Sequence, residues 1–351
     1  MSTRPEKERY VAQYERAYFI QTVDTHTGGD PTRIVVGGLP EIKGSTMMEK
    51  KQYLIDHFDF VRTSLMLEPR GHKDMFGAVL TEPVSPEADI GVVFMDTGGY
   101  LNMCGHGTIG VVTAILETGI VNKDGKEVHL NLDTPAGLVK VKAVRNDRNK
   151  VESVSLVNVP SFLWEADRKI KSSKYGELTI DVAFGGSFYA IVDPKAVGLP
   201  LEPKYADQLR DAGMLLLKEV NEQVQVQHPT LKEINRIDLI LFVDKSPNEG
   251  IHTRNVAVFG RSNVARSACG TGLSAQMATQ YAKNKLGLNE YYNTESIIQT
   301  VFKGRLLEET QVGDRKAVVP EITGDANVTG KHEFLITSDD PLSNGFLLGE
   351  N

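Results

Sequence analysis

The chain contains two cysteines, and both lie in the same pattern of residues. The pattern occupies residues 94–110 and again residues 259–275. Each copy has an apolar, strand-like run that ends in phenylalanine, then a polar loop, a Cys-Gly-x-Gly motif and a helix-like stretch. The spacing from phenylalanine to cysteine is the same in both copies, so Cys104 and Cys269 occupy equivalent positions in a repeat.

Helical periodicity follows each cysteine. The apolar positions are Ile109, Val112 and Leu116 in the first copy, and Leu273, Met277 and Tyr281 in the second. We therefore expect each cysteine at or just before the start of a helix, where the first backbone N–H groups have no partner within the helix. The helix macrodipole adds partial positive charge there. Such a position lowers the pKa of a thiol and leaves N–H groups that can bind a carboxylate.

Two thiols that face each other across one carboxylate-binding site suit a specific reaction. One sulfur, as thiolate, would remove the α-proton of a bound amino or hydroxy acid, and the other, as thiol, would protonate the opposite face. Backbone donors would stabilise the charge that builds up on the carboxylate. The repeat therefore predicts inversion of a stereocentre by Cys104 and Cys269. The alternatives are two buried structural cysteines, or a disulfide in an oxidised, inactive form.

Residues near the two motifs are candidates for substrate contact. His106 lies two residues after the first cysteine, where it could contact an amine or a carboxylate or could simply begin a helix. Thr271 is its counterpart in the second copy, and its N–H group is a candidate carboxylate donor. Phe94 and Phe259 hold matched positions before the cysteines. Together with Phe76, they either line the pocket or belong to the core.

Two histidine–aspartate pairs lie outside the repeat. Asp24 with His26, and His72 with Asp74, could support loops or ligate a metal. Their spacing matches no common zinc or iron site, so no metal is expected. No lysine context indicates pyridoxal phosphate, and the glycine pattern of a dinucleotide site is missing. A paired-thiol mechanism needs no cofactor, and we expect none.

Composition narrows the class of protein. The 351 residues carry a net charge of −7, with 40% hydrophobic and 24% charged residues, which is typical of a globular protein with two domains. The acidic balance without a basic block argues against a nucleic-acid partner. Residues 1–18 lack the apolar core of a signal peptide, and no run approaches the roughly 20 apolar residues of a membrane span. We expect a cytoplasmic protein with a small-molecule substrate and no membrane partner.

Two lobes are predicted, with a boundary near residue 162, where the strand-like pattern breaks and charge increases. The expected units are an extension at 1–16, a first lobe at 17–162 and a second lobe at 163–331, with a strand at about 332–349 that returns to the first lobe. Strand-like runs surround one central helix in each half.

Four local predictions concern the elements around these helices. A helix is expected at 46–58, where Thr46 and the glutamate three residues later form a capping box. A second helix is expected at 206–220. Residues 65–71 read as a strand, and residues 24–31 as a polar loop between two strands.

The motifs resemble the proline racemase family. The matching stretches are residues 66–72 (Met-Leu-Glu-Pro-Arg-Gly-His), 74–77 (Asp-Met-Phe-Gly), 100–110, 184–188 (Phe-Gly-Gly-Ser-Phe), 227–231 and 302–304. The resemblance covers nearly the whole chain. It implies an α+β, diaminopimelate epimerase-like fold of two pseudo-symmetric mixed-sheet domains, each wrapped around a central helix. It also implies an isomerase that works without pyridoxal phosphate on an amino-acid substrate, as a homodimer.

The resemblance implies roles for individual residues as well. Cys104 and Cys269 would be the acid–base pair. The backbone donors that hold the carboxylate would be those of Gly105, His106, Gly270 and Thr271. The pocket aromatics of proline racemases correspond to Phe76, Phe94 and Phe259.

Branches of the family differ in the second half of the site. Hydroxyproline dehydratases typically replace the second cysteine by threonine, so Cys269 argues against that activity. The 4-hydroxyproline 2-epimerases keep both cysteines but usually have a more polar pocket. The family motif usually reads Asp-Arg-Ser-Pro-Cys, whereas here Ala265 replaces the aspartate near the substrate nitrogen. We expect racemisation of proline or a related cyclic amino acid, with 4-hydroxyproline 2-epimerase or a weak or non-catalytic member as alternatives.

Overall fold

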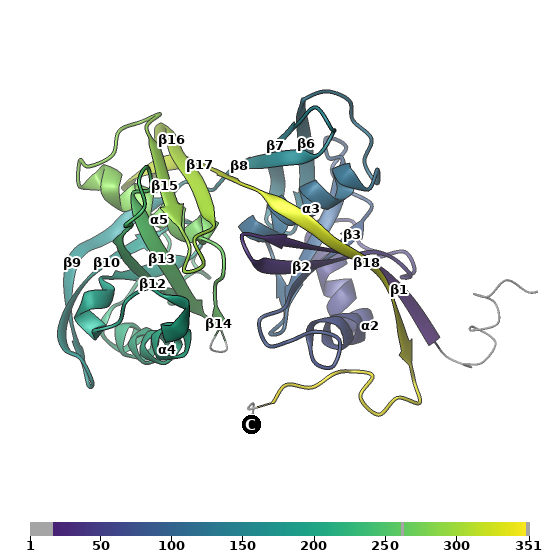
Figure 1. The fold of residues 1–351 in the computed structure, drawn as a ribbon, viewed down its shortest axis with the longest axis horizontal. Helices are drawn as coiled ribbons and strands as arrows, with labels where there is room; N and C mark the ends of the chain where they lie inside the picture. The colour runs from purple at the N-terminus through teal and green to yellow at the C-terminus, as the bar shows by residue number, and fades with distance from the viewer. Residues whose placement is uncertain (1–16, 261–262, 349–351) are drawn as a thin grey trace, which may run out of the picture.

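The computed structural model describes residues 17–260 and 263–348, so the extension expected at 1–16 lies outside the described residues. Two lobes lie side by side and are joined by extended strands (Figure 1). One lobe surrounds helix α3 (Gly105–Glu117) and the other surrounds helix α5 (Gly270–Ala282). Each helix starts directly after a cysteine, which confirms that prediction.

The two lobes repeat one order of elements. The first lobe contains β1 (Ala17–Thr27), β2 (Asp30–Gly37), α2 (Met47–Met66), β3 (Phe76–Thr81), β4 (Ile90–Asp96), β5 (Tyr100–Leu101), α3, β6 (Glu127–Thr134), β7 (Gly137–Arg145) and β8 (Val151–Val157). The second contains β10 (Gly176–Phe184), β11 (Phe188–Val192), η1 (Pro194–Val197), η2 (Pro203–Tyr205), α4 (Ala206–Gln223), β12 (Ile237–Lys245), β13 (Thr253–Phe259), β14 (Asn263–Val264), α5, β15 (Tyr291–Glu295), β16 (Val301–Val312) and β17 (Arg315–Gly324).

Strand pairing repeats in the same way. β2 pairs parallel with β3, as β11 does with β12, and β4 pairs parallel with β6, as β13 does with β15. The hairpins β6–β7 and β15–β16 are antiparallel. The expected pair of pseudo-symmetric lobes with mixed sheets is therefore observed.

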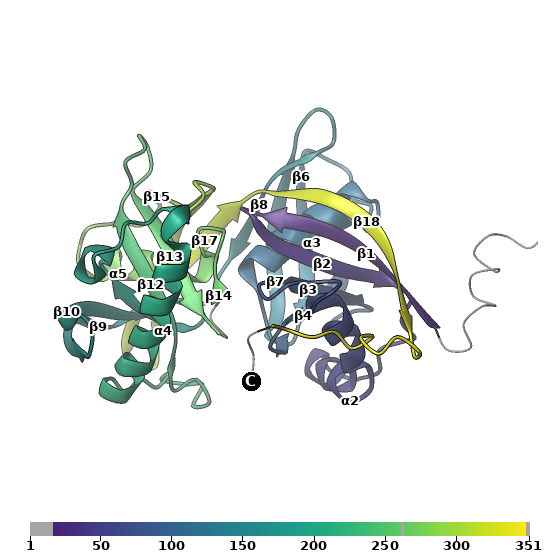
Figure 2. The ribbon, with the colours of Figure 1, turned by 60° about the horizontal axis from the view of Figure 1, so that its bottom comes forward.

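The chain crosses from one lobe to the other after β8 and again after β17. β9 (Phe162–Ser172) follows β8 but pairs with β10, and β18 (Ala326–Thr337) follows β17 but pairs with β1. Figure 2 shows β18 lying along β1 in one lobe and β9 beside β10 in the other. Between the lobes, β8 pairs antiparallel with β17, with Leu156 opposite Ile322. The returning strand begins at Ala326, earlier than the 332 expected from the sequence.

The cysteine helices are the centres of the two lobes. Every residue of α3 from Gly107 to Leu116 is buried, and so is every residue of α5 from Gly272 to Thr279. A helix that is apolar on all sides must be covered on all sides. The sheets wrap around these helices for that reason, and the residues directly after each cysteine stay half-buried.

The predicted helix at 46–58 is longer in the structure. Thr46 is its N-cap, as expected, and accepts a hydrogen bond from the Glu49 N–H, although the Glu49 carboxylate bonds to Ser45. α2 continues past a non-helical Phe58 to Met66, so the strand expected at 65–71 was wrong. The part of α2 that follows Phe58 buries apolar side chains in the first lobe. This packing overrides the local preference for a strand.

The polar loop expected at 24–31 was also wrong. β1 extends to Thr27, and the turn consists of Gly28 and Gly29, which both have positive φ. Asp24 of β1 and Arg33 of β2 lie opposite each other and form an ion pair at 2.9 Å. These polar residues therefore pair between two antiparallel strands and do not form a loop. The helix expected at 206–220 is present as α4. No helix in the described part of the chain is long and apolar enough to cross a membrane.

Candidate active site

Cys104 caps the first turn of α3. Its backbone is extended, and its sulfur accepts a hydrogen bond from the Gly107 N–H at 3.4 Å. The first helical hydrogen bond runs from the Thr108 N–H to the Cys104 carbonyl at 2.9 Å. The N–H groups of Gly105 and His106 precede that bond, so the helix itself offers them no acceptor. Two backbone donors therefore lie beside the Cys104 sulfur at the positive end of the helix dipole.

His106 is the charged partner of Cys104. Its Nδ1 lies 3.5 Å from the Cys104 sulfur, and its ring packs edge-on against Phe76 with centroids 4.6 Å apart. Burial lowers the pKa of His106, but the negative charge and hydrogen bond of Cys104 raise it more, with a smaller contribution from Asp30. The net result is a His106 pKa of about 9, so the ring beside the Cys104 sulfur is an imidazolium near neutral pH.

Cys269 begins α5 in a different conformation. Its φ of 49° lies in the left-handed region, which costs a non-glycine residue about 1–3 kcal/mol. Its sulfur contacts the hydroxyl of Tyr189 at 3.5 Å, and that hydroxyl bonds to the Thr271 hydroxyl at 2.6 Å. Burial raises the pKa of the Cys269 thiol, although hydrogen bonds from Tyr189, Gly272 and Thr271 oppose this. The two cysteines therefore share a position in the repeat but have different partners.

The second glycine of each Cys-Gly-x-Gly motif makes room for sulfur. A Cβ on Gly107 would lie 2.9 Å from the Phe94 ring and 3.2 Å from the Cys104 sulfur. A Cβ on Gly272 would lie 2.9 Å from the Cys269 sulfur. The two 2.9 Å contacts are closer than Cβ atoms tolerate, and the 3.2 Å contact would push the Cys104 sulfur by a few tenths of an ångström, so glycine lets each sulfur keep its place on the first turn.

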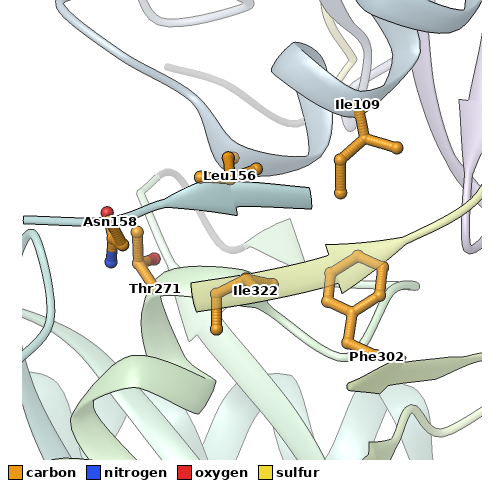
Figure 3. Close-up of a pocket in the computed structure, with 8 residues that line it drawn as sticks. Ile109, Leu156, Asn158, Thr271, Phe302 and Ile322 are labelled. Atoms are coloured by element: carbon orange, nitrogen blue, oxygen red, sulfur yellow. The ribbon is translucent and has the colours of Figure 1, made fainter. Parts of the chain in front are cut away.

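The starts of the two helices meet at one pocket between the lobes. α3 contributes Gly105 and Ile109, and α5 contributes Gly270 and Thr271. Figure 3 shows that Leu156 on β8 and Ile322 on β17 lie between the two helices, with Phe302 beside them. A Cβ on Gly105 would meet no atom within 4 Å, so the backbone of that first turn is open. The residues that follow both cysteines therefore line one common space.

The three phenylalanines of the sequence prediction occupy two environments. Phe76 and Phe259 come from different lobes, and their ring centroids lie 6.2 Å apart. With His106 against Phe76, they form an aromatic wall at the lobe boundary. Phe94 is 1% exposed and packs beneath the first turn of α3, so it supports the helix start from the core side.

Buried carboxylates bridge the lobes next to the cysteines. Asp30, on β2, accepts hydrogen bonds from the N–H groups of Arg266 and Ser267 at 2.8 and 2.9 Å. Asp74, just before β3, binds the Arg266 guanidinium at 2.7 Å and the Asn263 amide at 3.1 Å. The segment that leads into Cys269 is thus fixed to the first lobe by two acidic side chains.

Ala265 lies in an apolar cluster on the Cys269 side. It is 7% exposed, and it belongs to a cluster with Tyr189, Leu241 and Ala257 against which Cys269 packs. The methyl side chain of Ala265 carries no charge and cannot form a hydrogen bond.

Comparison with known proteins assigns the family. The model of the proline racemase family matches residues 22–347. A proline racemase of Clostridioides difficile is 47% identical over 329 residues, which cover 94% of this chain and 98% of that protein. The chain belongs to the proline racemase family. A 4-hydroxyproline epimerase of Brucella ovis is 44% identical over 326 residues, which cover 92% of this chain and 97% of that protein.

A solved structure shares the fold of this proline racemase family member. It is a hydroxyproline epimerase of Agrobacterium vitis with bound trans-4-hydroxy-L-proline, with a TM-score of 0.85 and 35% identity. The match covers 95% of this chain and 96% of that chain. The fold is therefore diaminopimelate epimerase-like, as the sequence resemblance implied.

The histidine–aspartate pairs support loops in this family member. His26 accepts a hydrogen bond from the Gly29 N–H at the β1–β2 turn, and His72 accepts one from the Asp74 N–H. Within residues 17–260 and 263–348, no group of three or more His, Cys, Asp or Glu side chains is arranged to hold a metal ion.

Sequence reasoning missed several residues of the site. Tyr189 was not singled out, although it directly follows the Phe-Gly-Gly-Ser-Phe stretch that carries part of the family resemblance. Asp30 and Arg266 were also missed as bridging residues. Nothing in their local sequence indicates that one binds the other's backbone, because the contact joins positions 236 residues apart. Only the fold brings them together.

Proposed function

We propose that this protein is a cofactor-independent isomerase that inverts the α-carbon of proline or a related cyclic amino acid, with Cys104 and Cys269 as the acid–base pair. The observation that carries this proposal is the common pocket of the two cysteine helices. Proline racemases and 4-hydroxyproline epimerases among the relatives support the class of substrate. The pairing of an anion-binding helix start with a thiol in each lobe supports the chemistry.

The substrate carboxylate would bind the N–H groups at the starts of the two helices. The donors are those of Gly105 and His106 on α3 and of Gly270 and Thr271 on α5. Each set lies at the positive end of a buried helix. These donors would stabilise the enolate charge that develops on the carboxylate when the α-proton leaves, an effect typically worth on the order of 10²–10³ in rate per donor.

The proton moves from one face of the substrate to the other. The thiolate of one cysteine takes the α-proton, so a C–H bond breaks, an S–H bond forms, and the electron pair moves into the carboxylate. The thiol of the other cysteine then gives its proton to the opposite face of the α-carbon, and that sulfur becomes the thiolate. The product has inverted configuration, and the two sulfurs have exchanged roles.

The aromatic wall favours an unsubstituted ring. Phe76 and Phe259 cannot donate or accept a hydrogen bond, so a 4-hydroxyl group against them would lose its bonds to water. We therefore favour proline over 4-hydroxyproline. Ala265 leaves the substrate nitrogen without the carboxylate that family members usually supply, and this weakens binding of any secondary ammonium.

Exchange in heavy water tests the activity and the substrate together. L-proline, D-proline, trans-4-hydroxy-L-proline and L-alanine are incubated separately with the enzyme in D₂O, and the products are separated by chiral chromatography and mass spectrometry. We expect α-deuteration with inversion of proline, slower reaction of the hydroxylated ring and none of alanine. Faster reaction of 4-hydroxyproline would make the protein an epimerase of that substrate, and no exchange with any cyclic amino acid would reject the proposal.

Single cysteine variants test the assignment of the pair. Cys104→Ser and Cys269→Ser should each lower racemisation at least about 10²-fold, since a hydroxyl at either position replaces the required acid or base. A variant that racemises at the wild-type rate would remove that cysteine from the mechanism.

Three further expectations remain proposals. The cysteines are free thiols, which supports a reducing compartment such as the cytoplasm. Family resemblance supports a homodimer, which light scattering of the purified protein would detect. The division into lobes at residue 162 is supported by the chain path from β8 to β9, and limited proteolysis near that residue would test it.

A further inference from the structure

The partners of the two thiols break the symmetry of the repeat. His106 and Thr271 occupy equivalent positions, two residues after their cysteines. Cys104 has an ionisable ring from its own helix at 3.5 Å, whereas Cys269 has a phenol from the sheet at 3.5 Å. The second cysteine thus depends on a residue outside its own motif.

Tyr189 reaches Cys269 from a specific position of the sheet. It lies on β11 opposite Leu239 of β12, which lies opposite Phe259 of β13. The equivalent path in the first lobe starts from Phe94 and passes through Ala78 to Ile34. Isoleucine has no hydroxyl, so the first lobe has no counterpart to the Tyr189 contact.

The Tyr189 side chain is fixed on all sides. It is 1% exposed, and its ring lies in a cluster of small residues with Ala183, Ala257 and Ala275. Its hydroxyl has two partners, the Thr271 hydroxyl at 2.6 Å and the Cys269 sulfur at 3.5 Å. A buried phenol with both bonds inside the active site is costly unless those bonds are used.

We propose that Tyr189 is a positioning residue for Cys269, which holds the sulfur toward the substrate and donates a hydrogen bond to it whenever Cys269 is the thiolate. This inference rests on the proposed function. When Cys269 is a thiol, the tyrosine hydroxyl donates to Thr271 and can accept from the S–H group. When Cys269 is a thiolate, Thr271 donates to Tyr189 and Tyr189 donates to sulfur. Only hydroxyl groups rotate, and no proton changes its owner within the Tyr189–Thr271 pair.

The charges around Cys269 explain why such a donor is needed. Burial is the largest cause that raises the pKa of both Cys269 and Tyr189. The Asp30 carboxylate of β2 raises the pKa of Cys269 further, and the negative charge of Cys269 raises that of Tyr189. A thiolate at this position therefore has only neutral donors to offset the Asp30 carboxylate and the loss of water. Tyr189 also stays protonated, because its own pKa is raised well above the usual value, so it keeps the proton it donates.

Tyr189→Phe tests this role, because it removes one oxygen and keeps the ring in its cluster. We expect kcat for racemisation to fall about ten- to a hundredfold, the effect of one hydrogen bond to a charged group. We also expect the pH at which Cys269 reacts half-maximally with iodoacetamide to rise, while the profile of Cys104 stays unchanged. Mass spectrometry of the two cysteine peptides separates these readouts.

Tyr292→Phe is the matched control, because Tyr292 is another buried tyrosine of the same lobe that packs against His252. It should change neither readout. Thr271→Val and Thr271→Ser provide a second test that does not depend on the folding of Tyr189→Phe. Valine should raise the pH at which Cys269 reacts half-maximally, whereas serine should leave that pH near the wild-type value. Only serine keeps the hydroxyl that fixes Tyr189.

Two results would overturn the inference. The first is a wild-type kcat together with a wild-type Cys269 profile in Tyr189→Phe. The second is an equal shift of both cysteine profiles, which would indicate a general loosening of the site. Failure of the proposed function is distinguishable, since it would appear as absence of exchange in the wild-type enzyme. The alkylation profiles of Cys269 would still report on Tyr189 in that case.

Discussion

The sulfur of Cys104 lies 3.5 Å from Nδ1 of His106, on the first turn of the same helix. The contact gives a basic imidazole partner to one cysteine of the pair, whereas the side-chain partners of the other are neutral hydroxyl groups. A reaction that passes charge from one sulfur to the other should therefore respond to the protonation of His106.

The pH dependence of activity should show this response. The pKa of His106 is raised from 6.5 to about 9, so the ring stays charged over a range in which a free imidazole would be neutral. As pH rises through about 9, the imidazolium is lost, and the positive charge beside the Cys104 sulfur is lost with it. We expect kcat/KM to fall on that alkaline side in a profile measured from about pH 6 to pH 10.

His106→Asn assigns this alkaline limb. The variant should lose the limb near pH 9, because asparagine has no proton that titrates in this range. His129→Asn is the control, because the His129 side chain is 72% exposed and pairs with Glu127 on the surface. A limb that keeps its position in His106→Asn would assign it to another group.

Glycine replacement should misplace the sulfurs. Gly272→Ala puts a Cβ 2.9 Å from the Cys269 sulfur, and the sulfur must move. A displacement of about 1 Å in an acid–base pair costs on the order of 10² in rate, so we expect kcat to fall roughly a hundredfold. Steady-state kinetics measure this, with thermal melting to show that the fold is kept.

Gly107→Ala should act in the same way on Cys104. Gly99→Ala is the matched control near the same helix, because a Cβ there would meet nothing within 4 Å. Near-normal kcat in Gly107→Ala and Gly272→Ala would show that the sulfur positions are less critical than the proposed reaction requires.

The starts of α3 and α5 could be predicted because the residues that indicate them are close together in the sequence. The glycines, the apolar periodicity and the repeat all lie within a few residues of Cys104 and Cys269. The return of a C-terminal strand to the first lobe was expected from the sequence, but the pairing of β8 with β17 between the lobes was not, because it joins residues far apart in the chain. The helix predicted at 46–58 was too short, because it ended at Phe58. In the structure, Phe58 is a kink, and α2 continues after it to Met66.

The contact of Tyr189 with Cys269 could not be predicted for a related reason. It joins positions 80 residues apart and depends on the parallel pairing of β11 with β12.

Equal spacing in the sequence did not predict equal environments for Phe94 and Phe259. Its spacing to Cys104 equals that of Phe259 to Cys269, yet Phe94 is buried in the core and Phe259 is only half-buried at the lobe boundary.

The ion pair between Asp74 and Arg266 should control closure of the lobes. Arg266 is 37% exposed at its side chain and Asp74 only 6%, so removal of the guanidinium leaves a buried carboxylate with fewer partners. Arg266→Gln should loosen the contact between lobes and reduce the fraction of molecules ready to bind. We expect KM to rise about tenfold with a smaller change in kcat, since apparent affinity scales with that fraction.

Arg70→Gln is the control for this variant. Arg70 pairs with Asp340 at 2.8 Å, a distance similar to that of the Asp74 pair, but both residues belong to the first lobe, before β3 and after β18. Its KM should stay near the wild-type value. Equal KM values in the two variants, or a loss of kcat alone in Arg266→Gln, would argue against a role in closure.

Ala265→Asp should exchange stability for affinity. A carboxylate at this position would lie in an apolar cluster with Leu241 and Ala257, which should destabilise the free protein by about 1–3 kcal/mol. With proline bound, the same carboxylate can pair with the secondary ammonium. We expect a lower melting temperature, a KM for proline lowered at least about tenfold, and recovery of the melting temperature when proline is added.

Ala265→Asn separates charge from size in this experiment. Asparagine has nearly the same volume as aspartate and also places a polar group in the apolar cluster. It carries no negative charge that could pair with the substrate ammonium. It should lower the melting temperature without lowering KM. If aspartate and asparagine give the same KM, the substrate nitrogen does not depend on a charge at residue 265, and Ala265 then favours a substrate whose nitrogen is neutral or bound elsewhere.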